Sequence, residues 1–385
     1  MGRPKEGILS SYPSQLRELI KKIRVKEPGF GALSIVTELR LEYGYVPKRL
    51  PSVSSVAAFL NQEGMAHGYE KHSRLPSLPY EPPMRPHELW QLDGRGNEDV
   101  KGVGPTALLD IKDVFSAVYA SCFPALIKSM QGHPDTESYQ MALRHGFHEF
   151  GMPDRIQCDH ASVFHENRSK SPFPTKLHLW LVGLGIGLLY SRVHQPTDQA
   201  EVERSHQVLF NQTIKSAEPY RDWPHFYAKC QKRRHVLNNE LPSRSCNGLP
   251  PLKYCPEARH SGRWYSPHKE VDLLDMKRVW QYLATCTWYR NVASNKTVSL
   301  GGQVYYLPNA KPREQLAICF CPCCQFLLFQ NANELLIAML PIKGLDKSVL
   351  IGKLDDFFNV PALQLPIPFD WQDKVCTTFL DLGLV

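Results

Sequence analysis

An alternation of strand-like and helix-like segments over residues 87–216 constrains the fold of this chain most. Three runs rich in β-branched and aromatic residues, HELWQLDG, TALLDIKD and SAVYASCF, are separated by polar turns and predict three strands. They are followed by a predicted helix over 135–151, a strand at RIQCDH, a helix at TKLHLWLVGLG, a strand at IGLLYSRV and a long helix at QAEVERSHQVLFNQTIKSA. This order predicts an α/β fold in which helices pack on a mixed sheet.

Different patterns flank this central segment. Residues 1–70 predict three short helices, the last rich in Ser and Ala, which suits a helix-turn-helix domain whose final helix enters a DNA groove. A plain three-helix packing module remains the alternative. Proline-dense residues 71–86 predict a linker, and residues 217–268 a polar, partly helical connector. Evenly spaced short strands over 269–385 predict a small β-barrel.

Charge and cysteine content narrow the possible partners and the compartment. The formal net charge is +7, and its basic residues cluster in KKIRVK, KCQKRR and KPR, which favours phosphate or another anionic surface as partner. The first residues lack the apolar core of a signal peptide, and the longest apolar run is too short to span a bilayer. The 11 cysteines therefore predict reduced thiols in a cytoplasmic protein.

Carboxylates at strand ends are the strongest sign of chemistry. Aspartate is disfavoured within strands, yet Asp93 and Asp159 both close apolar strand-like runs. Asp110 is a competitor, but together with Asp113 it is better explained as the start of a hairpin turn. Glu203 lies in the first turns of the helix that follows the last strand. Two strand aspartates and a helix glutamate can converge at one sheet edge and bind two divalent cations for phosphoryl transfer.

The same residues carry a resemblance to a known family. Segment 87–215 resembles the catalytic core of the DDE transposase and retroviral-type integrase superfamily, with the strongest likeness to bacterial insertion-sequence transposases. WQLD matches the family's first aspartate strand, RIQCD its second, and PTDQAEVER the signature around its glutamate. This alignment selects Glu203, followed by Arg204, over its neighbour Glu201.

The resemblance implies a fold and an activity. The core would be ribonuclease-H-like, and Asp93, Asp159 and Glu203 would be both catalytic and metal-binding, with two Mg²⁺ ions for which Mn²⁺ can substitute. The expected activity is cleavage of DNA 3′ ends and strand transfer by a homo-oligomer on DNA, with no membrane partner. In the cell, such a protein would be cytoplasmic and nucleoid-associated in a bacterium when bound to DNA.

Several departures from the family keep other functions open. His160 and Ala161 follow the second aspartate where the family has Asn and Gly, and Gln199 and Ala200 replace the usual Asn-Gly before the glutamate. The spacing from the second aspartate to the glutamate is also longer than the family's. A catalytically retired, transposase-derived DNA-binding protein is the alternative, and a ribonuclease-H-type nuclease is a third interpretation. Each carboxylate taken alone could simply be a solvated surface charge.

Further residues are candidates for contacts with DNA or metal. The polar and basic side chains expected to contact DNA are Ser54, Ser55, Arg204, His206, Lys232, Arg233 and Arg234. The CFCPCC run at 319–324 suggests zinc, but a zinc site needs four ligands and no matching pair lies nearby in the sequence, so a strand and turn explain it better.

Overall fold

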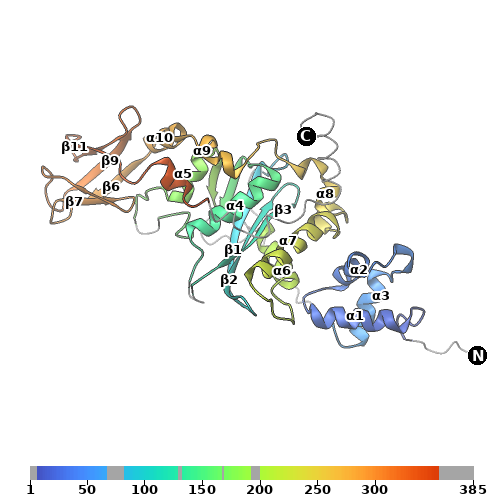
Figure 1. Cartoon of the computed structure of the whole chain (residues 1–385). Helices are drawn as coiled ribbons and strands as arrows, with labels where there is room; N and C mark the ends of the chain where they lie inside the picture. Colours follow the sequence, from blue (N-terminus) through green and yellow to red (C-terminus); the bar gives the residue numbers. More distant parts are fainter. Residues whose placement is uncertain (1–6, 67–81, 129–131, 167–168, 192–199, 355–385) are drawn as a thin grey trace, which may run out of the picture.

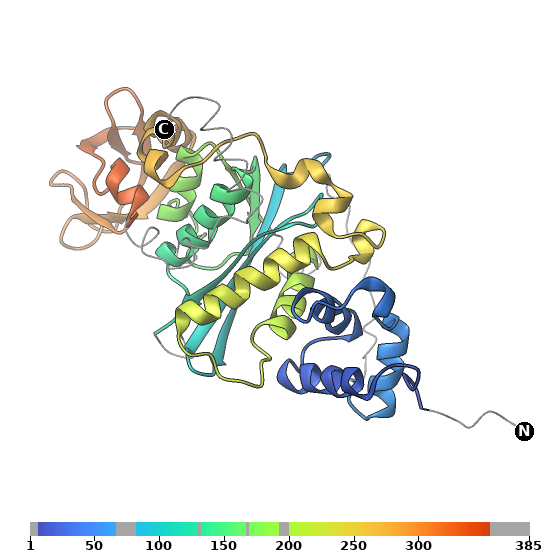
Figure 2. The same ribbon diagram turned by 45° about the vertical axis from the view of Figure 1, so that its right-hand side comes forward.

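The protein is described from a computed structural model, which covers residues 7–66, 82–128, 132–166, 169–191 and 200–354. Within these ranges the side chains of Arg95, Ala200, Glu201, Glu203 and Ser205 are not described. The chain forms an elongated molecule, with the N-terminal helices beside α6 and α7 at one end and the strands β6 to β11 at the other (Figures 1 and 2). The predicted linker over 71–86 lies largely outside the described residues.

A five-stranded mixed sheet forms the centre of the molecule. Its strands, in the order β3-β2-β1-β4-β5, are β3 (Tyr119–Leu126), β2 (Gly104–Asp113), β1 (Leu89–Val100), β4 (Arg155–Cys158) and β5 (Gly187–Tyr190). The first three pair antiparallel, whereas β4 and β5 run parallel to β1. The predicted mixed sheet is confirmed. However, β1 continues well beyond Asp93 and pairs with β2 along a long hairpin, so Asp93 does not end its strand as predicted.

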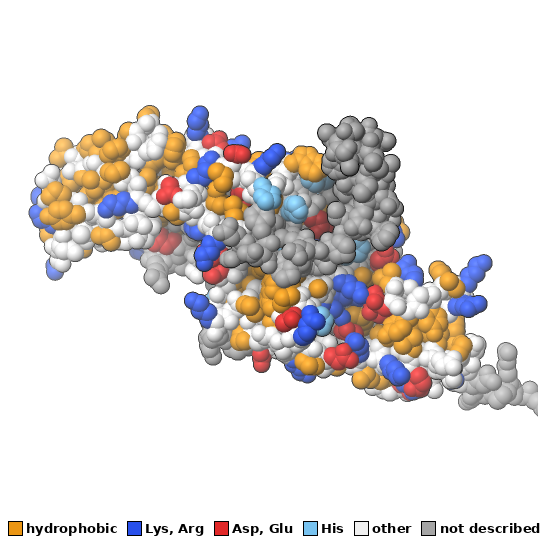
Figure 3. Space-filling view, viewed as in Figure 1, with side chains coloured by type: hydrophobic (Ala, Val, Ile, Leu, Met, Phe, Trp, Pro, Cys, Tyr) orange, Lys and Arg blue, Asp and Glu red, His pale blue; other side chains and the backbone are white. Residues whose placement is uncertain are grey.

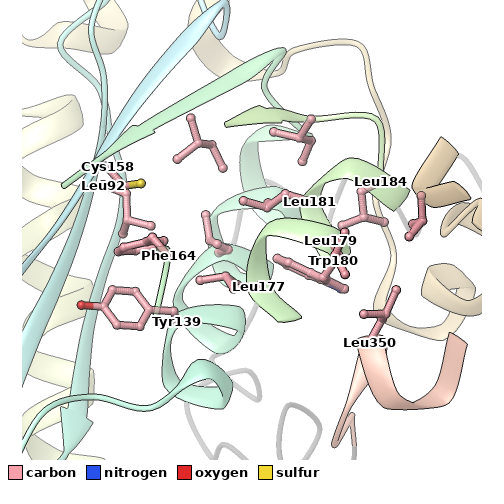
Figure 4. Packing of buried hydrophobic residues seen from close by; sticks show 14 of the residues in the cluster. Leu92, Tyr139, Cys158, Phe164, Leu177, Leu179, Trp180, Leu181, Leu184 and Leu350 are labelled. Carbon is pink, nitrogen blue, oxygen red and sulfur yellow. The ribbon is translucent and has the colours of Figure 1, made fainter. Parts of the chain in front are cut away.

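Helices cover both faces of this sheet. They are α4 (Thr136–Phe150) and α5 (Lys176–Gly183) on one face, and α6 (Ala200–Gln212) and α7 (Trp223–Asn239) on the other. The first face packs Leu92 and Cys158 of the strands against Tyr139 of α4 and Leu177 of α5 (Figure 4). Because side chains alternate along a strand, Leu108 belongs to the core on the second face. The helices therefore hold the sheet rigidly from both sides.

The N-terminal domain is a three-helix unit with its own small core. Its helices are α1 (Ser14–Lys26), α2 (Ala32–Leu41) and α3 (Val53–Gln62), with a 3-10 turn at Pro47–Arg49. Buried Ile20, Phe30 and Ile35 pack in its centre. The hydroxyl of Ser52 accepts a hydrogen bond from the N–H of Ser55 at 3.1 Å and caps α3. The three predicted helices are confirmed, whereas DNA binding by α3 stays a prediction.

Beyond α7 the chain passes through short helices into the C-terminal strands. These elements are the 3-10 turns Arg244–Cys246, Pro256–Arg259 and Pro267–Lys269, the helices α8 (Pro251–Tyr254), α9 (Glu270–Leu273), α10 (Met276–Ala284) and α11 (Lys347–Ile351), and the strands β6 (Thr287–Asn291), β7 (Thr297–Leu300), β8 (Gln303–Tyr306), β9 (Gln315–Cys321), β10 (Phe326–Gln330) and β11 (Leu336–Pro341). The apolar face of α10 packs beside α5 in the main core.

The C-terminal strands do not close into the predicted barrel. They form a four-stranded sheet in the order β11-β10-β9-β6 and a separate β7–β8 hairpin, so within the described chain β6 and β11 remain the two edges. The CFCPCC run forms the end of β9 and the turn into β10. Hydrophobic side chains gather on the surface of this end of the molecule (Figure 3). Among the C-terminal strands, Tyr289, Tyr306 and Leu336 are exposed. None of the described helices is both long and apolar enough to cross a membrane.

Candidate active site

Two neighbouring parallel strands carry Asp93 and Asp159 to the same part of the sheet. In the parallel pair of β1 and β4, Gln91 lies opposite Gln157, and the amide of Gln91 donates a hydrogen bond to the Gln157 side chain at 3.1 Å. Each aspartate follows its glutamine by two residues. Burial is the main cause of the raised pKa of Asp159, and the negative charge of Asp93 raises it further. The two carboxylates are thus close enough to repel each other.

Backbone N–H groups hold one oxygen of each carboxylate. The N–H of Gly94 donates to Asp93 Oδ1 at 2.8 Å, and the N–H of Ala161 donates to Asp159 Oδ1 at 3.0 Å. On the other face of the sheet, Tyr139 of α4 lies beside Gly94, where an added β-carbon would meet the tyrosine hydroxyl at 2.8 Å. Gly94 therefore allows α4 to approach the strand at the level of Asp93.

Helix α6 begins beside the same two strands. The N–H of Val202 donates to Gln91 Oε1 at 3.2 Å, and the Val202 side chain is fully buried. The backbone of Glu203 therefore follows directly after a residue anchored to β1, as the predicted site requires. The carboxylates of Glu203 and Glu201 lie outside the described side chains. The structure thus brings Asp93 and Asp159 together and places the first turns of α6 next to them.

Asp110, set aside in the sequence as a turn residue, lies inside the site. It pairs directly with Asp93 across the β1–β2 ladder and sits in the middle of β2, so the predicted turn position is wrong. Asp113 does form the turn, where it accepts hydrogen bonds from Ser116. The Asp110 side chain is 1% exposed, and its Oδ1 atom has no hydrogen-bond partner among the described atoms. The signal in the sequence was a charged residue between Leu109 and Ile111 in an apolar run.

His206 of α6 bridges the two aspartates. Its Nδ1 lies 2.7 Å from Asp110 Oδ2 and its Nε2 lies 2.9 Å from Asp93 Oδ2. Burial alone would lower the pKa of His206, but the carboxylates of Asp110 and Asp93 outweigh burial and raise the pKa to about 10. His206 was predicted to contact DNA. In the structure its side chain is buried between carboxylates instead.

Two of the basic residues predicted to contact DNA are also buried. Arg233 is 1% exposed, bonds to Gln212, and pairs with Glu38 of the N-terminal domain at 3.0 Å. Arg234 pairs with Glu149 of α4 and is likewise buried. The expectation for these two residues is therefore corrected, because their guanidinium groups fasten the N-terminal domain and α4 to α7.

The other predicted DNA contacts remain on the surface. Lys232 is half-exposed and pairs with Glu42 at 2.7 Å, and the Arg204 side chain is exposed. Ser54 is exposed and Ser55 half-buried in the first turn of α3, both within hydrogen-bond distance of the Ser52 hydroxyl. These four positions can be reached by a ligand, and a DNA contact for them stays a prediction.

The donors at this edge suit a hard divalent cation. Asp93 and Asp159 supply carboxylate oxygens, the ligands that Mg²⁺ prefers, and their mutual repulsion is of the kind that a bound dication relieves. Among the side chains that the structure describes, no three His, Cys, Asp or Glu residues are grouped as a metal site. The third carboxylate of the predicted trio, that of Glu203, is not among those side chains.

No family model matches the chain. It is similar to the integrase catalytic core domain of HTLV-2 in complex with magnesium, at 16% identity and a TM-score of 0.33, over 45% of this chain and 98% of that one. It is similar to the catalytic core domain of BIV integrase, at 15% identity and a TM-score of 0.32, over 45% of this chain and 95% of that one. A simian T-cell lymphotropic virus intasome structure matches 80% of this chain and 96% of its own, at 14% identity and a TM-score of 0.37.

Proposed function

We propose that this chain is a metal-dependent polynucleotidyl transferase that cleaves DNA 3′ ends and joins them to other DNA, as transposases and integrases do. The observation that carries the proposal is the placement of Asp93 and Asp159 on neighbouring parallel strands, beside the anchored first turn of α6. The sequence signature PTDQAEVER supports Glu203, which lies in α6, as the third carboxylate. DNA is the proposed substrate, and a homo-oligomer on DNA the proposed working state.

In the proposed reaction, the three carboxylates of the site would bind the metal ions. Asp93, Asp159 and Glu203 would hold two Mg²⁺ ions, which activate the attacking oxygen and stabilise the leaving oxygen when bound. In the first reaction, water attacks the phosphorus at the element end, the bond to the 3′ oxygen breaks, and that oxygen leaves as a 3′-hydroxyl. In the second reaction, this hydroxyl attacks a phosphorus of target DNA and displaces a 3′ oxygen there.

One observation favours a second candidate, a DNA-binding protein that has lost catalysis. Both oxygens of Asp93 already accept hydrogen bonds, from Gly94 and from His206, and the residues after Asp159 depart from the family pattern. A cleavage assay separates the two candidates. Its substrates are labelled duplexes with the sequences that flank the gene, and duplexes of scrambled sequence. It is run with Mg²⁺, with Mn²⁺ and with a chelator.

The variants in this assay are chosen to keep the fold. Asp93→Asn, Asp159→Asn and Glu203→Gln retain the shape of each side chain, and we expect each to lower cleavage by orders of magnitude while DNA binding persists. The matched control is Asp99→Asn, an exposed aspartate on the same strand, and it should cleave like the wild type. A wild type that is inert with both metals would favour the retired binder, and an active Asp159→Asn would refute the metal site.

The N-terminal domain is proposed to recognise the element ends through α3. Removing residues 1–64 should abolish the preference for flanking over scrambled duplex while weaker, salt-sensitive binding remains, since phosphate contacts are electrostatic. Binding constants measured at two salt concentrations check this. Equal discrimination by the shortened protein would show that α3 does not read the DNA sequence.

A further inference from the structure

We propose that Asp110 and His206 form a positioning pair that fixes the carboxylate of Asp93 in the active site. The inference deepens the proposed function and rests on it. Both contacts are short, at 2.7 Å from Asp110 to His206 and 2.9 Å from His206 to Asp93. Both ring nitrogens face carboxylate oxygens, so each nitrogen is placed as a donor. The imidazole therefore links the two carboxylates as a rigid spacer.

The burial of Asp110 is difficult to explain by folding alone. Removing a carboxylate from water is costly unless its charge is paired and its oxygens are bonded. Asp110 sits in the middle of an apolar strand, and its Oδ1 atom has no partner among the described atoms. A leucine or valine at this position would contribute apolar packing against α6. We infer that the charge is needed where it is, to orient the ring of His206.

A merely structural role, in which His206 pins α6 to the sheet, is the competing explanation. The helix already has other anchors to the sheet. Val202 and Leu209 of α6 are both fully buried, and the N–H of Val202 bonds to Gln91 of β1. The bond from His206 to Asp93 instead ends on a side chain that remains 24% exposed. His206 holds Oδ2 of this carboxylate, while the N–H of Gly94 donates to Oδ1.

The consequence for catalysis follows from how metal ligands are held. A carboxylate that binds a cation in one orientation needs its rotamer fixed beforehand, and hydrogen bonds from neighbouring side chains supply this. Loss of such a partner typically lowers metal affinity or activity by about 10- to 100-fold. His206 is therefore expected to act through Asp93, and Asp110 through His206, without either touching the DNA.

A pair of conservative variants separates positioning from packing. The amide nitrogen of a glutamine can take the place of Nε2, so His206→Gln keeps a donor for Asp93. The amide of an asparagine reaches only the place of Nδ1, so His206→Asn keeps the contact with Asp110 and loses that with Asp93. We expect Mn²⁺ affinity, measured by electron paramagnetic resonance on the full chain, to stay within a few-fold of wild type in His206→Gln. It should fall about 10- to 100-fold in His206→Asn.

Thermal unfolding and crystal structures of the variants complete the test. We expect His206→Gln to be the less stable variant on thermal unfolding, because it leaves the buried carboxylate of Asp110 without its His206 partner. Losses of Mn²⁺ affinity that follow stability, and so are greater in His206→Gln than in His206→Asn, would mean that His206 only packs. Crystal structures without metal provide an arm independent of catalysis. The Asp93 rotamer should be retained in wild type and His206→Gln but changed in His206→Asn. One unchanged rotamer in all three proteins would overturn the positioning role. A wild type that binds no Mn²⁺ would refute the proposed function, while the rotamers would still decide on the pair.

Discussion

The side chains of Arg144 and Glu270 are as deeply buried as that of Asp110. The two clusters to which these residues belong differ in how completely their charged groups are hydrogen-bonded. Arg144 donates two hydrogen bonds to Glu270, at 2.8 and 2.7 Å, and the indole of Trp180 and the hydroxyl of Tyr265 complete the glutamate. This closed cluster ties α4 to the short helix α9. The cluster of Asp93, Asp110 and His206 leaves one oxygen of Asp110 without a described partner and Asp93 partly open to solvent.

The completeness of hydrogen bonding indicates a structural role for the first cluster and a functional role for the second. Buried polar groups that are fully paired rigidify a fold, whereas incompletely paired groups cost stability. Arg144 and Glu270 have the completeness expected of a structural tie between elements. The carboxylates beside α6 are incompletely paired by comparison, and burial first and then the charge of Asp93 raise the pKa of Asp159.

Breaking the closed cluster should have the largest effect on stability. Arg144→Met leaves the fully buried Glu270 without its cation and should lower the free energy of unfolding by about 3–5 kcal/mol. Chemical denaturation of the full chain measures this. In the double variant Arg144→Met with Glu270→Met, part of the lost stability should return, because no uncompensated charge remains, although the Trp180 indole and the Tyr265 hydroxyl lose their acceptor. A single variant as stable as wild type would contradict the structural role of the pair.

The buried side chain of His87 should make the free energy of unfolding depend on pH, with an effect smaller than that of breaking the Arg144–Glu270 pair. His87 Nδ1 accepts from the Trp90 indole at 3.1 Å, and its Nε2 lies 3.1 Å from the Ala258 carbonyl. Burial lowers the pKa of His87 to about 4. The stability that it contributes is therefore present above its unfolded pKa of 6.5 and is lost as pH falls toward 4, at up to about 1.4 kcal/mol per pH unit.

The pH prediction is checked against a variant that does not titrate. His87→Phe should be less stable than wild type at pH 7, because it leaves the indole N–H of Trp90 unpaired. The gap between the two proteins should narrow at pH 5, where only the wild type is losing stability from this site. Urea titrations at both values measure the gap. A constant gap would mean that His87 is protonated equally in the folded and unfolded chains.

Removing one charge from the active-site edge should have the smallest effect, with the opposite sign. Burial first, and then Asp93, raise the pKa of Asp159, so ionising this carboxyl costs more free energy in the folded chain than in the unfolded chain. Asp159→Asn should therefore leave the free energy of unfolding unchanged or raise it by less than about 1 kcal/mol, because solvent screens part of the repulsion. A loss of several kcal/mol would mean that Asp159 is a structural ion-pair partner and not part of an open site.

Most of the central fold could be predicted from the sequence. The strands around WQLD and RIQC and the helix capped by Asp135 follow from local periodicity and capping, and the structure confirms them. Closure of the C-terminal strands could not be predicted in this way. Whether β6 pairs with β11 depends on long-range pairing, which the spacing of strands does not determine.

The site was predictable only in part, for a similar reason. Asp93 and Asp159 are conspicuous because each closes an apolar run. Asp110 lies within such a run, but its role depends on the register that pairs it with Asp93 and on His206, almost a hundred residues away along the chain. Likewise, the basic run at 232–234 resembles a DNA-binding patch in sequence. Only the docking of α2 and α4 on α7 shows that Arg233 and Arg234 are used inside the protein.

The most direct test of a metal site beside Asp93 and Asp159 uses crystals grown with Mn²⁺, with diffraction data collected at the manganese absorption edge. We predict an anomalous peak shared by the carboxylates of Asp93 and Asp159, with an oxygen of Glu203 as a further ligand and His206 still bonded to Asp93. An absent peak, or one held elsewhere, would contradict the account. A peak held by Glu201 in place of Glu203 would contradict the choice of the third carboxylate.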